Sequence, residues 1–279
     1  MKQIKIGLAQ ARQTSRLQDN AETILRFVDQ AVDADVQILC FPETQTVGYR
    51  VDITSSSLPV PVQELESLHQ QVADRCAAAG MACVLGTEIP GEGRVMPFNS
   101  AIVISEFGEV LGAQHKTKLT PLDAVAYSPG DTIKTYELFG IRVGVLICFE
   151  AFRFAETTRE CVRQGAQLVI HPQNNTTRPN DWKIPVHHSM IVTRAAENTI
   201  WFASCNACLE HQNSRSLIVA PDGRIHAQSE LKREELVVAE IDLDLATRAM
   251  FRFDLEGCAA PLFADTVRRE EYQSALAQK

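Results

Sequence analysis

The sequence IRVGVLICFE at residues 141–150 decides how we interpret the chain. Its segment 143–147 is uncharged and rich in β-branched side chains, which is typical of a strand covered on both faces of a sheet. The run ends at Cys148. Because ligands in open α/β sheets bind just beyond the carboxyl ends of strands, we expect this thiol at the rim of a sheet. A buried cysteine that behaves as a small hydrophobic residue is the alternative interpretation.

The composition indicates a globular protein and argues against nucleic acid or a membrane as a partner. The 279 residues are 45% hydrophobic and carry a formal net charge of −8 without a basic cluster. No apolar run approaches the roughly 18 residues of a membrane span. Residues 1–6 alternate like a strand and lack the apolar core of a signal peptide, so we expect a cytoplasmic protein whose eight cysteines are reduced.

The chain contains two halves with the same order of expected elements. In the first half we expect strands at 4–10, 36–41 and 81–86, helices at 18–33 and 62–79, and a hairpin at 101–104 and 110–114. In the second half we expect strands at 141–147, 167–173 and 201–205, helices at 155–164 and 187–198, a hairpin at 217–219 and 225–228, and a last strand at 236–241. No linker separates the halves. We therefore predict one α/β domain over residues 1–279, with a core at about 4–245, two packed sheets, internal pseudo-symmetry and helices on the outer faces.

Polar side chains follow three of the expected strands. Glu43, Lys116 and Cys148 each come directly after a strand end. In the repeat, Glu43 corresponds to Gln173 and Cys148 corresponds to Ala11, so the symmetry is broken at these positions. A solvated carboxylate or a surface lysine is the ordinary interpretation of each charged residue alone. Three such residues at strand ends indicate an active site.

This set of residues fits the hydrolysis of an amide. A thiolate is the nucleophile, so Cys148 needs a base or a nearby cation. Glu43 is suited to take the proton on attack and return it to a leaving amine. A lysine ammonium and the N–H of Phe149 are suited to stabilise the oxyanion, with Lys118 competing with Lys116 for that role. A serine hydrolase would need a Gly-x-Ser-x-Gly elbow, which this sequence lacks.

Four motifs together resemble those of the nitrilase (carbon–nitrogen hydrolase) superfamily, in its amidase-like branch. They are FPET at 41–44, HKTKL at 115–119, SPGD at 128–131 and ICFE at 147–150, in this order, and the resemblance covers about residues 4–245. It implies that Glu43 is the general base, Lys116 the transition-state stabiliser and Cys148 the nucleophile. It also implies an α-β-β-α sandwich that forms a homodimer or higher oligomer, with residues 255–279 at the interface.

The sequence departs from the family pattern in two places. Asp123 stands where many members have a second glutamate. Glu156 lies eight residues beyond Cys148, where the common pattern has seven, so we expect Phe152 and Arg153 to have an unusual placement at the pocket.

The remaining polar signals are assigned as follows. Loop residues after strand ends often determine specificity, and the candidates for substrate binding are Tyr49, Phe152, Arg153, Gln173, Asn174, Asn175 and Arg178. Cys205 and Cys208 form a lone Cys-x-x-Cys without further zinc ligands, so we expect incidental cysteines, no metal and no cofactor. His187 and His188 are interpreted either as helix-capping or as pocket residues, and Arg194 and Glu197 as a local ion pair.

We therefore expect a hydrolase of a small linear amide or carbamoyl compound that works through a cysteine thioester. A nitrilase with the same three residues is the alternative enzyme, and a catalytically silent interaction scaffold is the alternative of another class. Nitrilases proper typically carry Cys-Trp-Glu-Asn, whereas this chain has Cys-Phe-Glu-Ala at 148–151, which favours an amide.

Overall fold

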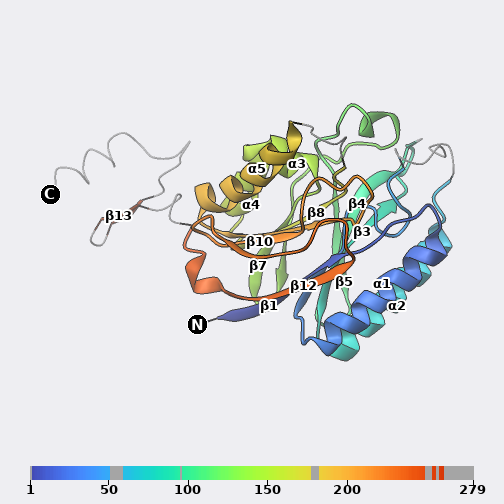
Figure 1. Ribbon diagram of the computed structural model, residues 1–279, viewed down its shortest axis with the longest axis horizontal. Coiled ribbons are helices and arrows are strands. Elements are labelled where there is room, and N and C mark those ends of the chain that lie inside the picture. Colours follow the sequence, from blue (N-terminus) through green and yellow to red (C-terminus); the bar gives the residue numbers. More distant parts are fainter. Residues whose placement is uncertain are drawn as a thin grey trace.

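Two six-stranded mixed sheets form the body of the protein in the computed structural model (Figure 1). The structure describes residues 2–50, 59–94, 96–176 and 182–248, together with the backbone of β13 (Phe253–Leu255) and β14 (Cys258–Ala260). The first sheet has the strand order β12 (Glu235–Asp242), β1 (Gln3–Gln10), β2 (Ile38–Cys40), β3 (Ala82–Ile89), β4 (Phe98–Ile104) and β5 (Val110–His115). The second has the order β11 (Ile225–Gln228), β10 (Leu217–Val219), β9 (Trp201–Asn206), β8 (Leu168–Gln173), β7 (Ile141–Val145) and β6 (Thr135–Leu138).

The two sheets have the same internal topology, which confirms the predicted repeat. In each sheet three parallel strands are followed by two antiparallel ones. The register also agrees, because Gly7 lies opposite Leu39 in the first sheet and Gly144 lies opposite Val169 in the second. A sixth strand, antiparallel to β1 or β7, completes each sheet.

Alternation of side chains along β1 explains why this strand is buried on both faces. Ile4, Ile6 and Leu8 belong to the same apolar cluster as Val143 and Val145 of β7. Ala9 belongs instead to the cluster under the helices of the first sheet. The sheets therefore pack against each other through one face of β1 and against helices through the other.

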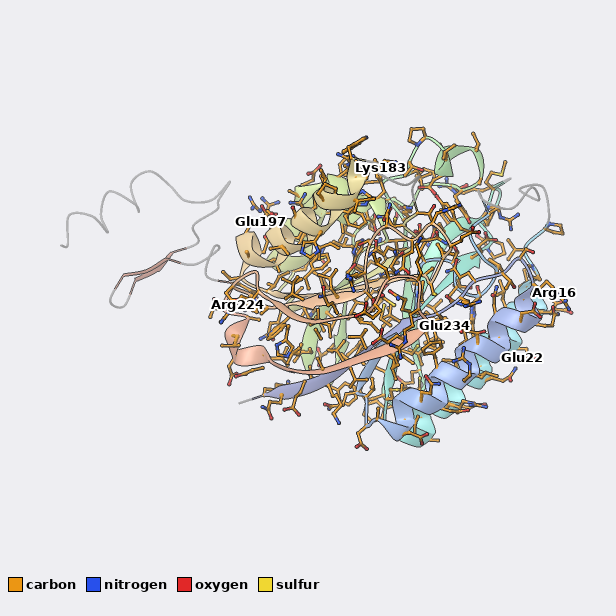
Figure 2. All side chains as sticks on the ribbon, in the orientation of Figure 1. Arg16, Glu22, Lys183, Glu197, Arg224 and Glu234 are labelled. Atoms are coloured by element: carbon orange, nitrogen blue, oxygen red, sulfur yellow. The ribbon has the colours of Figure 1, made fainter. Side chains whose placement is uncertain are left out.

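The helices cover the outer faces of the sheets, as the sequence predicted (Figure 1). The helices α1 (Leu17–Asp33) and α2 (Val62–Ala79) cover the first sheet, and α3 (Phe149–Arg153), α4 (Ala155–Arg163) and α5 (Lys183–Asn198) cover the second. Charged side chains such as Arg16 and Glu22 project from the outer side of the molecule near α1 (Figure 2). Within the described parts of the chain, no helix combines the length and the apolar character needed to cross a bilayer.

Several predicted boundaries were wrong. The helix expected at 187–198 begins four residues earlier, at Lys183, because Pro185 falls in the first turn, where a missing N–H costs no hydrogen bond. The short strand β6 and the short helix α3 were not predicted. Residues 261–279, and with them most of the segment expected at a dimer interface, lie outside the described residues.

Candidate active site

Glu43 lies directly after β2, where β3 approaches the chain closely. A Cβ atom at Gly86 of β3 would overlap the carbonyl oxygen of Pro42 and lie 2.7 Å from the amide nitrogen of Thr44, so glycine permits this contact. The carboxylate is held from both sides. Its Oε1 accepts hydrogen bonds from Lys116 Nζ (2.6 Å) and Asn99 Nδ2 (2.7 Å), and its Oε2 accepts one from the N–H of Asn174 (2.9 Å).

Lys116 lies between two carboxylates. It follows β5, and the N–H of Gly130, in the SPGD motif, donates to its carbonyl at 2.9 Å. Its Nζ is 2.6 Å from Glu43 Oε1 and 2.9 Å from Asp123 Oδ2, with 1% of the lysine side chain exposed and 0% of either carboxylate. Burial alone would lower the pKa of Lys116, but the nearby carboxylates outweigh it and raise the pKa above its usual value. Lys116 is therefore a fixed cation in this site.

Asp123 lies in the short 3-10 helix η1 (Asp123–Val125) and contacts the lysine although it is shorter than the glutamate of the family pattern. Its Oδ2 accepts the N–H of Thr120 at 2.8 Å, and its Oδ1 accepts the hydroxyl of Tyr49. Burial acts to raise the pKa of Asp123, but Lys116 and the Tyr49 hydroxyl hold it below its usual value. Burial, together with the carboxylates of Glu43 and Asp123, raises the pKa of Tyr49, so its hydroxyl stays a donor.

Cys148 occupies a strained turn between β7 and α3. Its φ of 49° and ψ of −112° fall in a region that residues with a side chain rarely adopt. Its N–H donates to the carbonyl of Pro172 at 2.8 Å. Burial and the charge of Glu43 raise the pKa of Cys148, while Lys116 acts in the opposite direction. The sulfur is therefore a thiol before substrate binds, and a base must take its proton for it to act as a nucleophile.

The buried carboxylate of Glu150 ties this turn to the lysine loop. Its Oε1 accepts the N–H of Ile147 at 2.6 Å, and its Oε2 accepts both the N–H and the hydroxyl of Thr117 at 2.8 Å. Thr117 directly follows Lys116. Glu150 thus couples the positions of Cys148 and Lys116.

Cys148 and Tyr49 line a cavity of about 340 Å³, and the buried cluster of Glu43, Lys116 and Asp123 lies behind this lining. Its lining consists of Tyr49, Thr120, Pro121, Leu122, Cys148, Phe149, Phe152, Arg153, Asn174, Asn175, Thr176, Lys183 and His187. Thr120, Asn174 and Asn175 contribute polar groups to the lining, and Leu122, Phe149 and Phe152 contribute apolar ones. At the rim, the guanidinium of Arg153 lies 4.8 Å from the ring centroid of Trp182. The volume suits a small molecule rather than a polymer.

Comparison with known proteins identifies the family. The model of the carbon–nitrogen hydrolase family matches residues 5–250. The chain belongs to the carbon–nitrogen hydrolase family. The resemblance to the nitrilase superfamily is therefore confirmed, and the protein is an enzyme of the carbon–nitrogen hydrolase type.

Individual relatives agree with this assignment. The hydrolase is 32% identical over 228 residues to an (R)-stereoselective amidase from Pseudomonas sp, and the match covers 79% of this chain and 78% of that protein. It is 28% identical over 256 residues to a nitrilase from Pyrococcus abyssi, and the match covers 88% of this chain and 90% of that protein. A mutant of the amidase from Nesterenkonia sp. AN1, solved in complex with butyramide, superposes with a TM-score of 0.73 at 23% identity, and the match covers 87% of this chain and 92% of that one. That structure has the same fold.

The structure brings together most of the residues singled out in the sequence. Tyr49, Phe152, Arg153, Asn174 and Asn175 line the cavity of the hydrolase. Gln173 does not line it; its side chain is buried behind the wall, where its Nε2 donates to Ser204 Oγ at 2.7 Å. Arg178 lies outside the described residues. His187 lines the cavity, and its ring stacks on that of Phe152 with 4.4 Å between the ring centroids. It is therefore a pocket residue rather than a helix cap.

Other signals have structural roles. Arg194 and Glu197 form the predicted ion pair at 3.0 Å, and Arg194 also donates to the carbonyls of Ala151 and Phe152 at the end of α3. Cys205 is buried, with its Sγ 3.2 Å from the carbonyl oxygen of Cys40. Among the described residues, no group of three His, Cys, Asp or Glu side chains is placed to hold a metal ion.

Sequence reasoning missed the buried partners Asn99, Glu150 and His171. Asn99 lies within β4, where a polar residue gives no signal of its own. Glu150 stands two residues after Cys148 in the ICFE motif, and its position there does not reveal its partners. His171 stands inside an apolar strand, and the signal that marks it is the mismatch with Phe41 at the equivalent place of the repeat.

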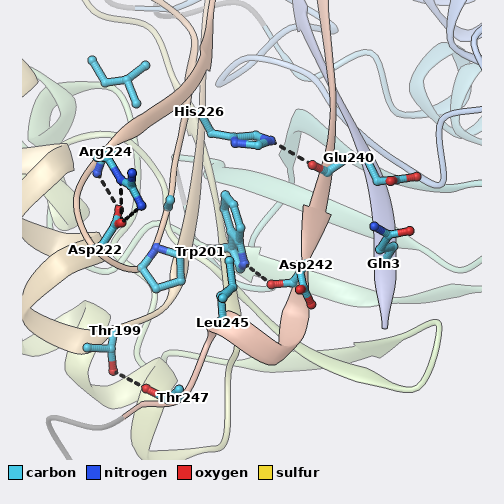
Figure 3. A pocket seen from close by; sticks show the side chains of 13 residues that line it. Gln3, Thr199, Trp201, Asp222, Arg224, His226, Glu240, Asp242, Leu245 and Thr247 are labelled. Carbon is cyan, nitrogen blue, oxygen red and sulfur yellow. Dashed lines mark hydrogen bonds and ion pairs between the residues drawn. The ribbon is translucent and has the colours of Figure 1, made fainter. Parts of the chain in front are cut away.

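A larger cavity of about 760 Å³ lies at the opposite ends of the parallel strands (Figure 3). Gln3, at the start of β1, and Trp201, at the start of β9, both line it. The indole Nε1 of Trp201 donates to the carbonyl of Asp242, and the side chain of Asp222 pairs with that of Arg224. None of the catalytic candidates lines this cavity, and ligands of open α/β sheets bind at the other ends of the strands.

Proposed function

We propose that this hydrolase cleaves a linear amide or carbamoyl C–N bond through a thioester on Cys148 and releases ammonia or an amine. The observation that carries the proposal is the buried Glu43–Lys116–Asp123 cluster beside a cysteine at the wall of a small cavity. Burying three charges is costly unless each is paired. A catalytically silent scaffold would not need such a cluster next to a nucleophile, so this observation favours an enzyme over that alternative.

Glu43 is the general base in this mechanism. The raised pKa of Cys148 means that the thiol proton must leave as the sulfur attacks the carbonyl carbon. Glu43 accepts that proton and delivers it to the leaving nitrogen when the C–N bond breaks. Water then attacks the thioester while Glu43 takes a proton from it. The thiol regains that proton when the carboxylic acid is released, so the enzyme returns to its starting state.

The oxyanion is stabilised by Lys116 and by the N–H of Phe149. Lys116 carries a fixed charge close to Cys148, and Phe149 is the first residue of α3, where an N–H has no acceptor within the helix. Asp123 keeps the lysine in place and charged. Donors fixed before the reaction stabilise a developing charge without having to reorganise.

The amide is favoured over the nitrile for a chemical reason. Both substrates lead to the same thioester, but an amide needs an oxyanion site and a proton for the leaving nitrogen, which these residues supply. Among the relatives, the Pseudomonas protein is described as an amidase and the Pyrococcus protein as a nitrilase. Polar donors and acceptors on Asn174 and Asn175 suit a polar substrate, and Arg153 at the rim suits a carboxylate on it.

The test is ammonia release from matched pairs, each nitrile against its own amide, with Cys148→Ala as the inactive control. We expect faster release from each amide and a mass adduct on Cys148 when the reaction is quenched. Cys148→Ala should abolish turnover, while Cys205→Ala should leave it largely in place. Turnover by Cys148→Ala above a few per cent of the wild-type rate would contradict the mechanism, and faster release from several nitriles would favour the nitrilase.

We also propose a cytoplasmic homodimer built from a single domain over residues 1–279. The family resemblance supports the dimer, and the seven described cysteines, all of them free, support a reducing compartment. Light scattering on the purified full chain tests the assembly. A monomer at all concentrations would contradict it.

A further inference from the structure

His171 is a fully buried histidine on the inner side of the cysteine turn. It lies in β8, and its ring contacts Phe152 and Phe202 edge to face. Its Nε2 is 3.0 Å from the carbonyl oxygen of Cys148, and its Nδ1 is 2.9 Å from Ser204 Oγ on β9. A buried imidazole with two such contacts has one defined orientation.

The partners of His171 fix its tautomer. The Cys148 carbonyl only accepts, so Nε2 carries the proton and donates. Burial lowers the pKa of His171 to about 3, so the ring is neutral and Nδ1 is an acceptor. The Ser204 hydroxyl therefore donates to Nδ1, and its oxygen accepts a hydrogen bond from Gln173 Nε2 at 2.7 Å. A chain of three hydrogen bonds thus runs from Gln173 through Ser204 and His171 to the nucleophile's carbonyl.

That carbonyl shares a rigid unit with the proposed oxyanion donor. The C=O of Cys148 and the N–H of Phe149 belong to one trans peptide plane and point in opposite directions. A donor that fixes the carbonyl on one side fixes the N–H on the other. We propose that His171 is a positioning residue that orients and polarises the Cys148–Phe149 peptide as an oxyanion donor, an inference that rests on the proposed function.

The contacts around the turn show why a donor from the sheet matters. The N–H groups of Ala151 and Phe152 also donate to the Cys148 carbonyl, at 3.1 and 3.3 Å, but both belong to α3, the helix that the turn itself begins. His171 is a donor to this oxygen from the sheet. The turn carries a positive φ at Cys148, a strained conformation that persists only where its surroundings hold it.

The internal repeat provides a natural comparison. The register that pairs Leu39 with Gly7 and Val169 with Gly144 places His171 at the position of Phe41 in the first sheet. Phe41 is also fully buried, and its half carries Ala11 where the other carries Cys148. Burying a polar ring costs free energy that phenylalanine avoids. The histidine therefore appears only in the half that carries the nucleophile.

The test compares His171→Phe and His171→Gln in the full-length enzyme. Phenylalanine fits the equivalent site of the repeat but donates no hydrogen bond, whereas glutamine keeps an N–H donor. We expect His171→Phe to lower kcat for a primary amide roughly 10-fold to 100-fold, at or below the loss seen when an oxyanion donor is removed. KM should change little, and His171→Gln should recover part of kcat. Ser204→Ala, which frees Nδ1, should give a smaller loss.

A second measurement separates positioning from general damage to the site. Methyl methanethiolsulfonate transfers a methylthio group to a thiolate and builds no oxyanion. Cys148 of the His171→Phe variant should therefore react with it at the wild-type rate. The reaction is followed by the mass of the peptide that contains Cys148. His226→Phe is the matched control, because His226 also lies 2.8 Å from a backbone carbonyl, that of Glu240, but at the far cavity (Figure 3). It should leave kcat unchanged.

The outcomes are distinct. Unchanged kcat in His171→Phe, or an equal fall in turnover and in methylthiolation, would overturn the inference. If the wild-type enzyme hydrolyses amides and Cys148→Ala does not, either of these results removes only the role of His171. If the wild-type enzyme itself releases no ammonia or amine from any amide, the proposed function fails first and the inference falls with it.

Discussion

At the scale of single residues, two lysines two positions apart in a short loop have opposite surroundings. Lys116 is buried between Glu43 and Asp123, whereas Lys118 is exposed with its Nζ 5.6 Å from the ring centroid of Phe154. Lys116→Met should raise the activation free energy of the kcat step by about 3 kcal/mol or more, as when an oxyanion donor is lost. Lys118→Met should cost far less. Steady-state kinetics with one amide gives the ranking, and the reverse order would show that the motif is misassigned.

The second residue-scale prediction concerns Arg153 at the rim. Its exposed guanidinium stacks on Trp182 and makes no described ion pair, so it is available to a substrate carboxylate. Arg153→Gln should lower kcat/KM about 10-fold or more for an amide that bears a distal carboxylate, as for a lost charged hydrogen bond. The neutral methyl ester of the same compound should be affected little. Equal effects on the acid and the ester would contradict carboxylate recognition.

At the scale of elements, the approach of β3 to the Glu43 turn predicts an unusually sensitive glycine. Gly86→Ala places a methyl group against the backbone of Pro42 and Thr44, which flank the base, so the turn must shift. We expect loss of most activity together with a destabilisation of about 1–3 kcal/mol, typical of overpacking. Gly80→Ala is the control. It strains the left-handed C-cap of α2, where nothing lies within 4 Å of the new methyl group.

Gly80→Ala should lower the free energy of unfolding by about 1 kcal/mol, as expected for alanine in a left-handed conformation, and leave kcat unchanged. Urea unfolding and ammonia release, measured on both variants, separate the two effects. If the two variants had equal kcat under conditions in which both are fully folded, the close approach at Gly86 would not be what positions Glu43.

The elements themselves were predictable to different degrees. Long apolar runs such as residues 143–147 predicted buried strands, and the repeat predicted how the two sheets correspond. The strand β6 was not predicted because its sequence, TYEL, is only four residues long and lies beside a turn at Phe139–Gly140. The catalytic candidates were found because polar residues directly after strand ends stand out. Asn99 and His171 were not, because a polar residue inside a strand shows its role only through its partners.

At the scale of the whole molecule, buried thiols dominate the expected dependence of stability on pH. Burial is the largest cause of the raised pKa values of Cys40, Cys83, Cys148 and Cys161. In the unfolded chain these thiols ionise near pH 8.5, as free cysteines do. Above that pH the native state therefore binds more protons than the unfolded state, and the free energy of unfolding falls as the pH rises.

The magnitude and the pH range follow from the same linkage. Each thiol that stays protonated only in the native state contributes a fall of about 1.4 kcal/mol per pH unit above its unfolded pKa. Lys116 acts in a different range. Because its folded pKa is raised, its contribution is fully present below about pH 10.4 and is lost only as the pH passes through the raised value. Between these limits the loss of stability belongs mainly to the thiols.

Urea unfolding under reducing conditions at several values between about pH 7 and pH 10 tests this linkage. We expect the urea concentration at the unfolding midpoint to fall steadily as the pH rises above about 8.5, the pKa of an unfolded cysteine. The double variant Cys83→Ala, Cys161→Ala should be less stable at neutral pH, because both side chains are buried, but should show a shallower fall, because two of the linked protons are gone. A slope that is unchanged in the double variant would show that groups other than these buried thiols control the alkaline limit.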